Sequence, residues 1–222
     1  MSEREPGARN NPGGESGTPA GEASGDPTNP PEDIDEQEAL RDPPQIWVGS
    51  LTDYNDGRLY GAWIRADQEP DELRAAIAGM LAGSPWLAET GEPAEEWGIF
   101  DFDGFGSFPV DEFEDLDIVA TVARGIAEHG PAFAAWADLH DGDLDMLVGF
   151  DDAYLGEYDS PEAWARETLG ETALEAELDR LVPEGLRPYV VIDYAGFARD
   201  AEIGGDIHVE HRPGGVWIFA ML

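Results

Sequence analysis

Two kinds of periodicity follow one another in residues 45–81, QIWVGSLTDYNDGRLYGAWIRADQEPDELRAAIAGML. IWVGSL and LYGAWIRA are short apolar runs separated by the turn-like residues 55–57, which is typical of two β-strands joined by a loop. Pro70 then opens PDELRAAIAGML, in which apolar residues recur at helical spacing behind an acidic first turn. A further apolar run, EEWGIFDFDGF, predicts a third strand that begins near Trp97. The predicted fold class is therefore α+β, beginning with a small sheet and one helix.

Helices are predicted through the middle of the chain. Residues 116–127 carry apolar side chains at helical spacing, and this helix should end at His129 and Gly130. Pro131 should open a second helix, and DLDMLVGFDDAYL at residues 143–155 predicts a third. Short helices with short connections are expected to form a compact bundle.

The last part of the chain is predicted to combine helices with a β-hairpin. Ser160 and Pro161 are the expected N-cap and first residue of one helix, and residues 174–181 have the leucine spacing of another. Residues 189–198 are also predicted to be helical. The end of the chain, DIHVEHRPGGVWIFAML, predicts a strand, a glycine-rich turn and a strand.

These elements predict an acidic tail followed by three small domains. Residues 1–44 are rich in Pro, Gly, Ser, Glu and Asp without a periodic apolar pattern, so we expect a disordered tail. The expected domains are an α+β domain at 45–105, a helical bundle at 106–148 and a C-terminal α+β domain at 149–222. Five tryptophans that lie in apolar strands or helix faces are expected in the cores: Trp47, Trp63, Trp97, Trp136 and Trp217.

The net charge is the extreme property of this chain. There are 49 Asp and Glu against 12 Lys and Arg, giving a net charge of −37, and all twelve cations are arginine. Residues 1–44 contribute −8 and residues 45–222 contribute −29, so the tail is not the main source. Such a surface is not expected to bind nucleic acid or an anionic membrane directly, because both require cations to displace counterions. The charge indicates a basic partner, or none.

Two residue types are missing, and their absence limits the catalytic and metal-binding chemistry open to this chain. The chain has no lysine and no cysteine, which excludes a P-loop lysine, a Schiff-base lysine, a thiolate nucleophile, cysteine zinc sites and disulfides. It has no apolar run long enough for a membrane span, and its N-terminus lacks a hydrophobic signal core, so a cytoplasmic protein is expected.

Candidate metal sites fail on spacing. Asp141, Asp143 and Asp145 match positions 1, 3 and 5 of an EF-hand loop, but Met146 and Asp152 stand where that loop requires glycine and a bidentate glutamate. His208 and His211 would point to opposite faces of a strand. Asp101 and Asp103 have no accompanying phosphate cradle. No metal, no cofactor and no catalytic residue is expected.

The acids recur in every segment instead of forming one cluster, and few cations neutralise them. Sustained self-repulsion of this kind suggests a function that the charge itself performs. The sequence from Ile46 onward resembles the ArdA family of antirestriction proteins, which are protein mimics of DNA. Four blocks carry the resemblance in the family's order: IWVGSLTDYNDGRLYGAWIRA, EEWGIFDFDGFGSF, EFEDLDIVATVARGIAEHGPAFAAWAD and FDDAYLGEYDSPEAWA. The family's usual AIHDYEG is replaced here by GIFDFDG at residues 98–104.

The resemblance implies a dimer of three-domain subunits that imitates bent DNA and occupies the DNA-binding groove of type I restriction–modification enzymes. It also implies that carboxylates stand in for phosphates. We define the acidic set as the candidates for this role: Asp101, Asp103, Asp111, Glu112, Glu114, Asp115, Asp117, Asp138, Asp141, Asp143, Asp145, Asp151, Asp152, Glu157, Asp159 and Glu162. Phe150, Tyr154 and Tyr158 are expected to pack, with a dimer contact as their candidate role.

Three other functions fit the same composition. The first is an acidic interaction module for another basic DNA-binding protein, such as a repressor. The second is a metal-dependent enzyme that uses clustered acids. The third is a protein of unrelated function adapted to high salt, in which acidic, lysine-poor surfaces are common.

Overall fold

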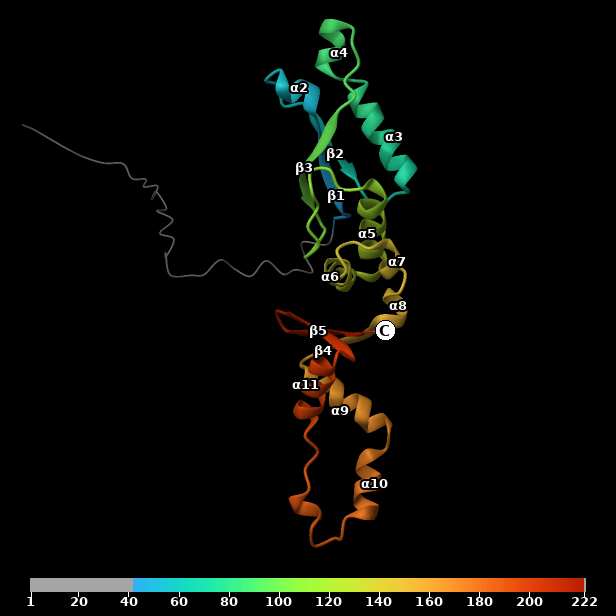
Figure 1. The fold of residues 1–222 in the computed structure, drawn as a ribbon, viewed down its shortest axis with the longest axis vertical. Helices are drawn as coiled ribbons and strands as arrows, with labels where there is room; N and C mark the ends of the chain where they lie inside the picture. The colour runs from blue at the N-terminus through green and yellow to red at the C-terminus, as the bar shows by residue number, and fades with distance from the viewer. Residues whose placement is uncertain (1–41, 222) are drawn as a thin grey trace, which may run out of the picture. The chain divides into compact units, whose positions relative to one another are not determined.

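The computed structural model describes residues 42–221, and they form two three-stranded antiparallel sheets among short helices (Figure 1). This arrangement confirms the α+β class. The predicted tail lies outside the described residues except for its last three. Of these, Pro44 is buried, and its carbonyl accepts a hydrogen bond from the Ala66 amide at 2.8 Å. The domain boundaries expected after residues 105 and 148 stay a prediction.

The first sheet has the strand order β2-β1-β3. It consists of β1 (Gln45–Ser50), β2 (Gly61–Arg65) and β3 (Trp97–Asp103), the three predicted strands. One face carries Ile46, Val48, Ile64 and Ile99, which are all buried in the first hydrophobic core. The opposite face carries Trp63, which is 46% exposed, so the prediction of a core position for this tryptophan is wrong.

Short helices flank this sheet. The predicted helix α3 (Pro70–Leu81) packs on β2 with Leu73 and Ile77 buried. Two further helices, α2 (Leu51–Asn55) and α4 (Pro85–Thr90), were not predicted from the sequence. Both begin at a serine that accepts a backbone hydrogen bond, Ser50 for α2 and Ser84 for α4.

The two middle helices are confirmed as α5 (Leu116–His129) and α6 (Pro131–Leu139). Gly130 separates them with φ of 76°, a conformation that favours glycine. They pack closely because Gly125 leaves room for the ring of Phe133. Trp136 is buried as predicted.

The prediction of one continuous helix at 143–155 is wrong. The chain instead forms α7 (Leu144–Leu147), α8 (Phe150–Ala153) and the strand β4 (Tyr154–Tyr158). β4 pairs antiparallel with β6 (Gly215–Ala220), about sixty residues later in the chain. This long-range pairing outweighs the local helical pattern.

The C-terminal helices are α9 (Pro161–Glu171), α10 (Leu174–Leu181), the 3-10 turn η1 (Arg187–Tyr189) and α11 (Tyr194–Gly204). Ser160 caps α9 as predicted. The helix expected at 189–198 begins only at Tyr194, because the Asp193 carboxylate accepts a hydrogen bond from the Gly196 amide at 2.7 Å and caps the helix there.

The predicted hairpin is confirmed as β5 (Ile207–Arg212) and β6, and the second sheet has the order β4-β6-β5. Alternate residues of β6 enter different cores. Trp217 and Phe219 belong to the first hydrophobic core, whereas Val216 and Ile218 belong to the second, with Trp164 and Tyr194. Burial on both faces explains the continuous apolar run VWIF. None of the described helices is long and apolar enough to cross a membrane.

Candidate functional site

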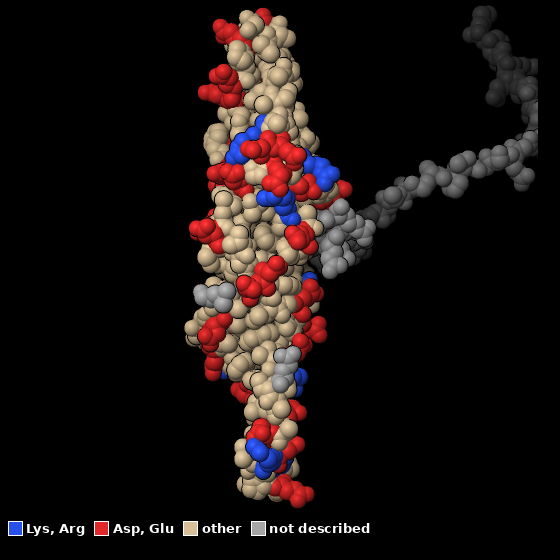
Figure 2. Space-filling view, turned by 90° about the vertical axis from the view of Figure 1, so that its right-hand side faces the viewer, with Lys and Arg blue, Asp and Glu red and all other residues tan. Residues whose placement is uncertain are grey.

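The acidic set lies almost entirely at the surface. Fourteen of its sixteen members are exposed, and the other two, Glu114 and Asp117, are half-buried. They come from both sheets, from the helices α5 to α9 and from the loops between these elements. In Figure 2 the carboxylates are scattered over the visible face, with uncharged surface between them, instead of being gathered into one patch. On this face the described carboxylates therefore form no single acidic patch.

Most members of the acidic set have no cationic partner within residues 42–221. Each of the nine arginines within residues 42–221 forms an ion pair, but most of these pairs use acids outside the set. The exceptions are Asp117 with Arg74, Glu157 with Arg212, Glu162 with Arg166, and Asp151, which faces His129. The remaining twelve have no described arginine or histidine within ion-pair distance. Their charge is available to an external cation.

Two members of the set also have a local structural role. Asp115 caps α5 by accepting a hydrogen bond from the Asp117 amide at 2.9 Å, and Asp143 caps α7 in the same way through the Asp145 amide at 2.9 Å. Negative charge at a helix N-terminus is favoured by the helix dipole. Part of the acidity therefore stabilises the fold, and replacements at these two positions need a side chain that can still cap.

Like charges are close together around Asp138. Partial burial raises the pKa of this carboxyl, and the neighbouring charges of Glu210 and Asp141 raise it further. His140 offers little compensation, because burial lowers its pKa although Asp143 favours its charged form. The imidazole is therefore neutral at pH 7. Like-charge crowding of this kind is a cost that a partner cation would relieve.

Asp53, the one acid that is buried within residues 42–221, was not singled out from the sequence. Asp53 is fully buried and accepts hydrogen bonds from the Ser50 hydroxyl at 2.7 Å, from the Ser84 hydroxyl and from the Trp86 amide at 3.0 Å. Burial opposes its charge, but the three hydrogen bonds and Arg58 outweigh burial and lower the pKa of Asp53. This carboxylate joins α2 to α4. With no nucleophile-activating base among its hydrogen-bond partners, its role is structural.

The candidate dimer residues pack within the protomer. Phe150 is only 3% exposed and lies with its ring 5.1 Å from those of Tyr154 and Phe133. Tyr154 and Tyr158 are half-buried, and the Tyr158 hydroxyl donates to the Leu155 carbonyl at 3.1 Å. Packing is thus their visible role, and a dimer contact at Tyr154 or Tyr158 stays a prediction.

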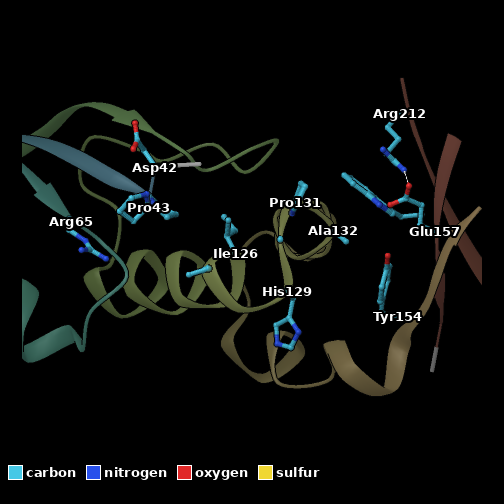
Figure 3. Close-up of a pocket in the computed structure, with 14 residues that line it drawn as sticks. Asp42, Pro43, Arg65, Ile126, His129, Pro131, Ala132, Tyr154, Glu157 and Arg212 are labelled. Carbon is cyan, nitrogen blue, oxygen red and sulfur yellow. Dashed lines mark ion pairs between the residues drawn. The ribbon is translucent and has the colours of Figure 1, made fainter. Parts of the chain in front are cut away.

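A groove of about 620 Å³ lies beside these residues (Figure 3). Its floor includes Ile126 and Pro131, and its charged groups come from both ends. At one end Arg212 pairs with Glu157 and stacks on Trp217, 4.9 Å from the ring centroid. The other end holds Arg65 and Asp42. These lining charges cancel, so the groove is not a strong site for an ion of either sign.

No group of three or more acids and histidines among residues 42–221 is arranged to hold a metal ion. The three acids with EF-hand spacing are not directed at a common point. Asp143 caps the N-terminus of α7, and Asp141 lies in a turn with φ of 50°. His208 and His211 alternate along β5, opposite Phe219 and Val216 of β6. None of these residues is brought together into a reaction centre.

Fold and surface thus define an acidic α+β protein whose charge is dispersed and largely uncompensated. A comparison with family models matches residues 46–213 to the antirestriction protein family ArdA. The match covers most of the chain, and the chain belongs to this family. Its function is therefore antirestriction, which implies an interaction with restriction–modification enzymes; ArdA is not a known enzyme family. A search of curated proteins finds no significant match to the sequence.

Proposed function

We propose that this protein inhibits type I restriction–modification enzymes by occupying their DNA-binding groove in place of DNA. The observation that best supports this proposal is the exposure of the acidic set. Fourteen members are exposed, and twelve have no cationic partner among the described residues. A groove that binds DNA presents Lys and Arg to phosphates. Exposed, unpaired carboxylates are the protein groups that can replace those phosphates.

The amount of charge supports mimicry of a long duplex. Residues 45–222 carry a net charge of −29, so a homodimer would carry twice that. Duplex DNA has about one charge per 1.7 Å, so this charge corresponds to at most roughly 100 Å of DNA. Binding would be driven by release of counterions from the acidic protein and from the basic groove. We propose the homodimer as the inhibitory form.

Catalysis is not required by this mechanism. Inhibition should be stoichiometric and independent of ATP, and neither the enzyme nor its DNA should be covalently changed. The full three-domain arrangement and the acidic set as contact residues belong to the same proposal.

The test is competition between this protein and labelled DNA for the purified core methyltransferase of a type I enzyme, followed by fluorescence anisotropy. The proposal predicts complete displacement of DNA at an equivalent of protein dimer. A basic repressor and a nucleoid protein serve as parallel targets. Equal or tighter binding to those targets would favour the alternative of a general acidic module, and catalytic turnover of enzyme or DNA would overturn mimicry.

A further inference from the structure

One face of the first sheet is aromatic, and the short helix α2 contributes Tyr54 to it. Its strands place Trp63 of β2, Trp47 of β1 and Asp101 of β3 in one cross-strand row. Cross-strand neighbours point to the same side of a sheet. A register shift after Trp47 adds Phe100, whose ring lies 5.6 Å from that of Trp47. We call Trp47, Trp63, Phe100 and Tyr54 the aromatic face.

Glycines form the floor on which two of these rings lie. A Cβ atom placed on Gly49 would come 2.8 Å from both Phe100 and Trp47, and one on Gly61 would come 2.7 Å from Trp47. A Cβ atom on Gly98 would come 3.0 Å from Phe100. The three glycines occupy one cross-strand row, and the absence of their Cβ atoms leaves room for the rings of Trp47 and Phe100 close to the backbone. Tyr54 supports Phe100 edge-on, with 5.5 Å between ring centroids.

The outer parts of this face remain open to solvent. Trp63 is 46% exposed, and Tyr54 is exposed as well. In contrast, the residues that alternate with them, such as Ile46 and Ile64, are buried in the first core. An ordered aromatic surface that stays exposed is a candidate binding surface.

Carboxylates border the aromatic face. Asp101 lies in the row of the two tryptophans, and the Glu112 side chain reaches Gly98, with its Cγ atom 3.1 Å from where a Cβ would stand. Neither acid has an arginine or histidine partner within the described part of the chain. Aromatic rings beside unpaired carboxylates offer both contacts that a guanidinium group makes, since its plane stacks on a ring while its N–H groups donate to oxygen.

We infer that the aromatic face binds arginine side chains of the partner. A second copy of this chain is disfavoured as the occupant of this face, because each of its nine arginines within residues 42–221 already forms an ion pair with an acid of its own chain. An uncharged apolar partner would leave Asp101 and Glu112 without a cation. The inference rests on the basic partner of the proposed function, and it adds a contact that prefers arginine to lysine, which a set of phosphate-mimicking carboxylates alone would not provide.

The test measures binding of hexaarginine and hexalysine to the full-length protein by calorimetry at moderate salt. Carboxylates alone attract both peptides, whereas stacking favours arginine. We expect the wild type to bind hexaarginine about threefold more tightly than hexalysine. Trp63→Ser should abolish this preference and leave hexalysine binding unchanged, while Trp63→Phe should retain part of it.

The matched control is Ile203→Ser, which removes another exposed apolar side chain, on α11. It should leave the preference for arginine intact. The indole N–H resonance of Trp63 should shift with hexaarginine, which provides a readout even if Trp63→Ser lowers stability. Equal affinities for the two peptides, or an unchanged preference in Trp63→Ser, would overturn the inference.

Displacement of DNA and preference for arginine are separate measurements, so they distinguish failure of this inference from failure of the proposed function. If the protein displaces DNA from the methyltransferase but shows no preference for arginine, only the inference about the aromatic face is wrong. If the protein prefers arginine through Trp63 but does not displace DNA, the proposed function is wrong and the inference about the aromatic face stands.

Discussion

Asp53 differs from every exposed acid of this protein because it is buried and fully hydrogen-bonded. The carboxylate accepts from two serine hydroxyls and one backbone amide, and so holds the starts of α2 and α4 together. An unpaired partner left behind in such a site costs the free energy of its desolvation.

Asp53→Asn is expected to lower the free energy of unfolding by about 2 kcal/mol, the range for hydrogen bonds to a charged group. The amide keeps the size of the side chain but loses the charge and one acceptor. Urea denaturation followed by circular dichroism measures the change. The control is Asp200→Asn at an exposed position of α11, for which the change should stay within about 0.5 kcal/mol. Equal effects of the two replacements would contradict a structural role for Asp53.

The pH dependence follows from the direction of the shift. The pKa of Asp53 in the folded protein is below its ordinary value of 3.8. Ionised Asp53 therefore stabilises the fold above that value, and this stabilisation is lost as the pH falls through the lower, folded pKa. The difference between wild type and Asp53→Asn should be constant from pH 7 to about pH 5 and should shrink below about pH 4.

Single residues were the hardest feature to predict from the sequence. Asp53 is one of 49 acids and sits in a polar stretch that is typical of a loop, so nothing local distinguishes it. Its serine partners are three and thirty-one positions away, and only the folded chain brings Ser84 to it. The core position predicted for Trp63 is wrong for a different reason: its strand is confirmed, but the side chain lies on the sheet face opposite the first core and is 46% exposed.

At the scale of elements, two helical glycines make a matched pair. Gly125 of α5 faces α6, and a Cβ there would lie 2.2 Å from the Phe133 ring. Gly79 of α3 has no atom within 4 Å of the same position. Gly125→Ala should destabilise by about 1–3 kcal/mol through overpacking. Gly79→Ala should stabilise by about 0.5–1 kcal/mol, because alanine loses less backbone entropy.

Thermal denaturation of both variants provides the measurement. Opposite signs of the two shifts in Tm would show that the α5–α6 contact, and not glycine itself, sets the effect at Gly125. A stabilising Gly125→Ala would mean that the two helices are farther apart than described.

Elements with local start signals could be predicted, and elements held by distant partners could not. Proline at the first position predicted α3, α6 and α9 correctly. The strand β4 was not predicted, because the residues before it do form helical turns and its strand partner β6 comes much later in the chain. α4 was not predicted although it starts with the same Ser–Pro pair as α9, because it has only six residues and none of them is buried, so no apolar periodicity marks it.

At the scale of the whole molecule, the sequence predicted the excess of acid, but it could not predict which acids are neutralised. The nine described arginines pair mostly with acids outside the acidic set. Examples are Arg65 with Asp67, Arg124 with Glu69 and Arg187 with Asp179. Pairs such as Arg124 with Glu69 join residues far apart in the chain. The number of free carboxylates therefore depends on tertiary structure.

Deletion of residues 1–41 tests whether the tail contributes to inhibition. This segment carries ten acids and three arginines and precedes the family match, which begins at residue 46. The deletion retains Pro44, which is buried. We expect the affinity for the methyltransferase core to change by less than about tenfold, because most of the charge is retained. A larger loss, measured in the same competition assay, would place part of the mimic in the tail.

Dispersed charge predicts that binding weakens gradually and through salt. Asp151→Asn or Asp152→Asn alone should change the affinity little, by analogy with exposed ion pairs worth about 0–1 kcal/mol. Five replacements together, at Asp111, Glu112, Glu114, Asp115 and Asp117, should weaken binding about tenfold or more at low salt. Asparagine at Asp115 can still cap α5, and the loss of like-charge repulsion favours the fold, so the variant should remain folded.

The slope of log affinity against log salt identifies the mechanism. Each lost contact should reduce its magnitude by at most about 0.9, the value for one phosphate of B-DNA, so the variant with five replacements should show a flatter dependence. The matched control removes the same number of charges from the tail, at Glu3, Glu5, Glu15, Glu22 and Asp26, and should retain the slope. If both variants lose affinity equally, net charge and not its position on the fold determines binding. If a single replacement abolishes binding, or if affinity is independent of salt, the partner recognises a localised site and the dispersed mimic is wrong.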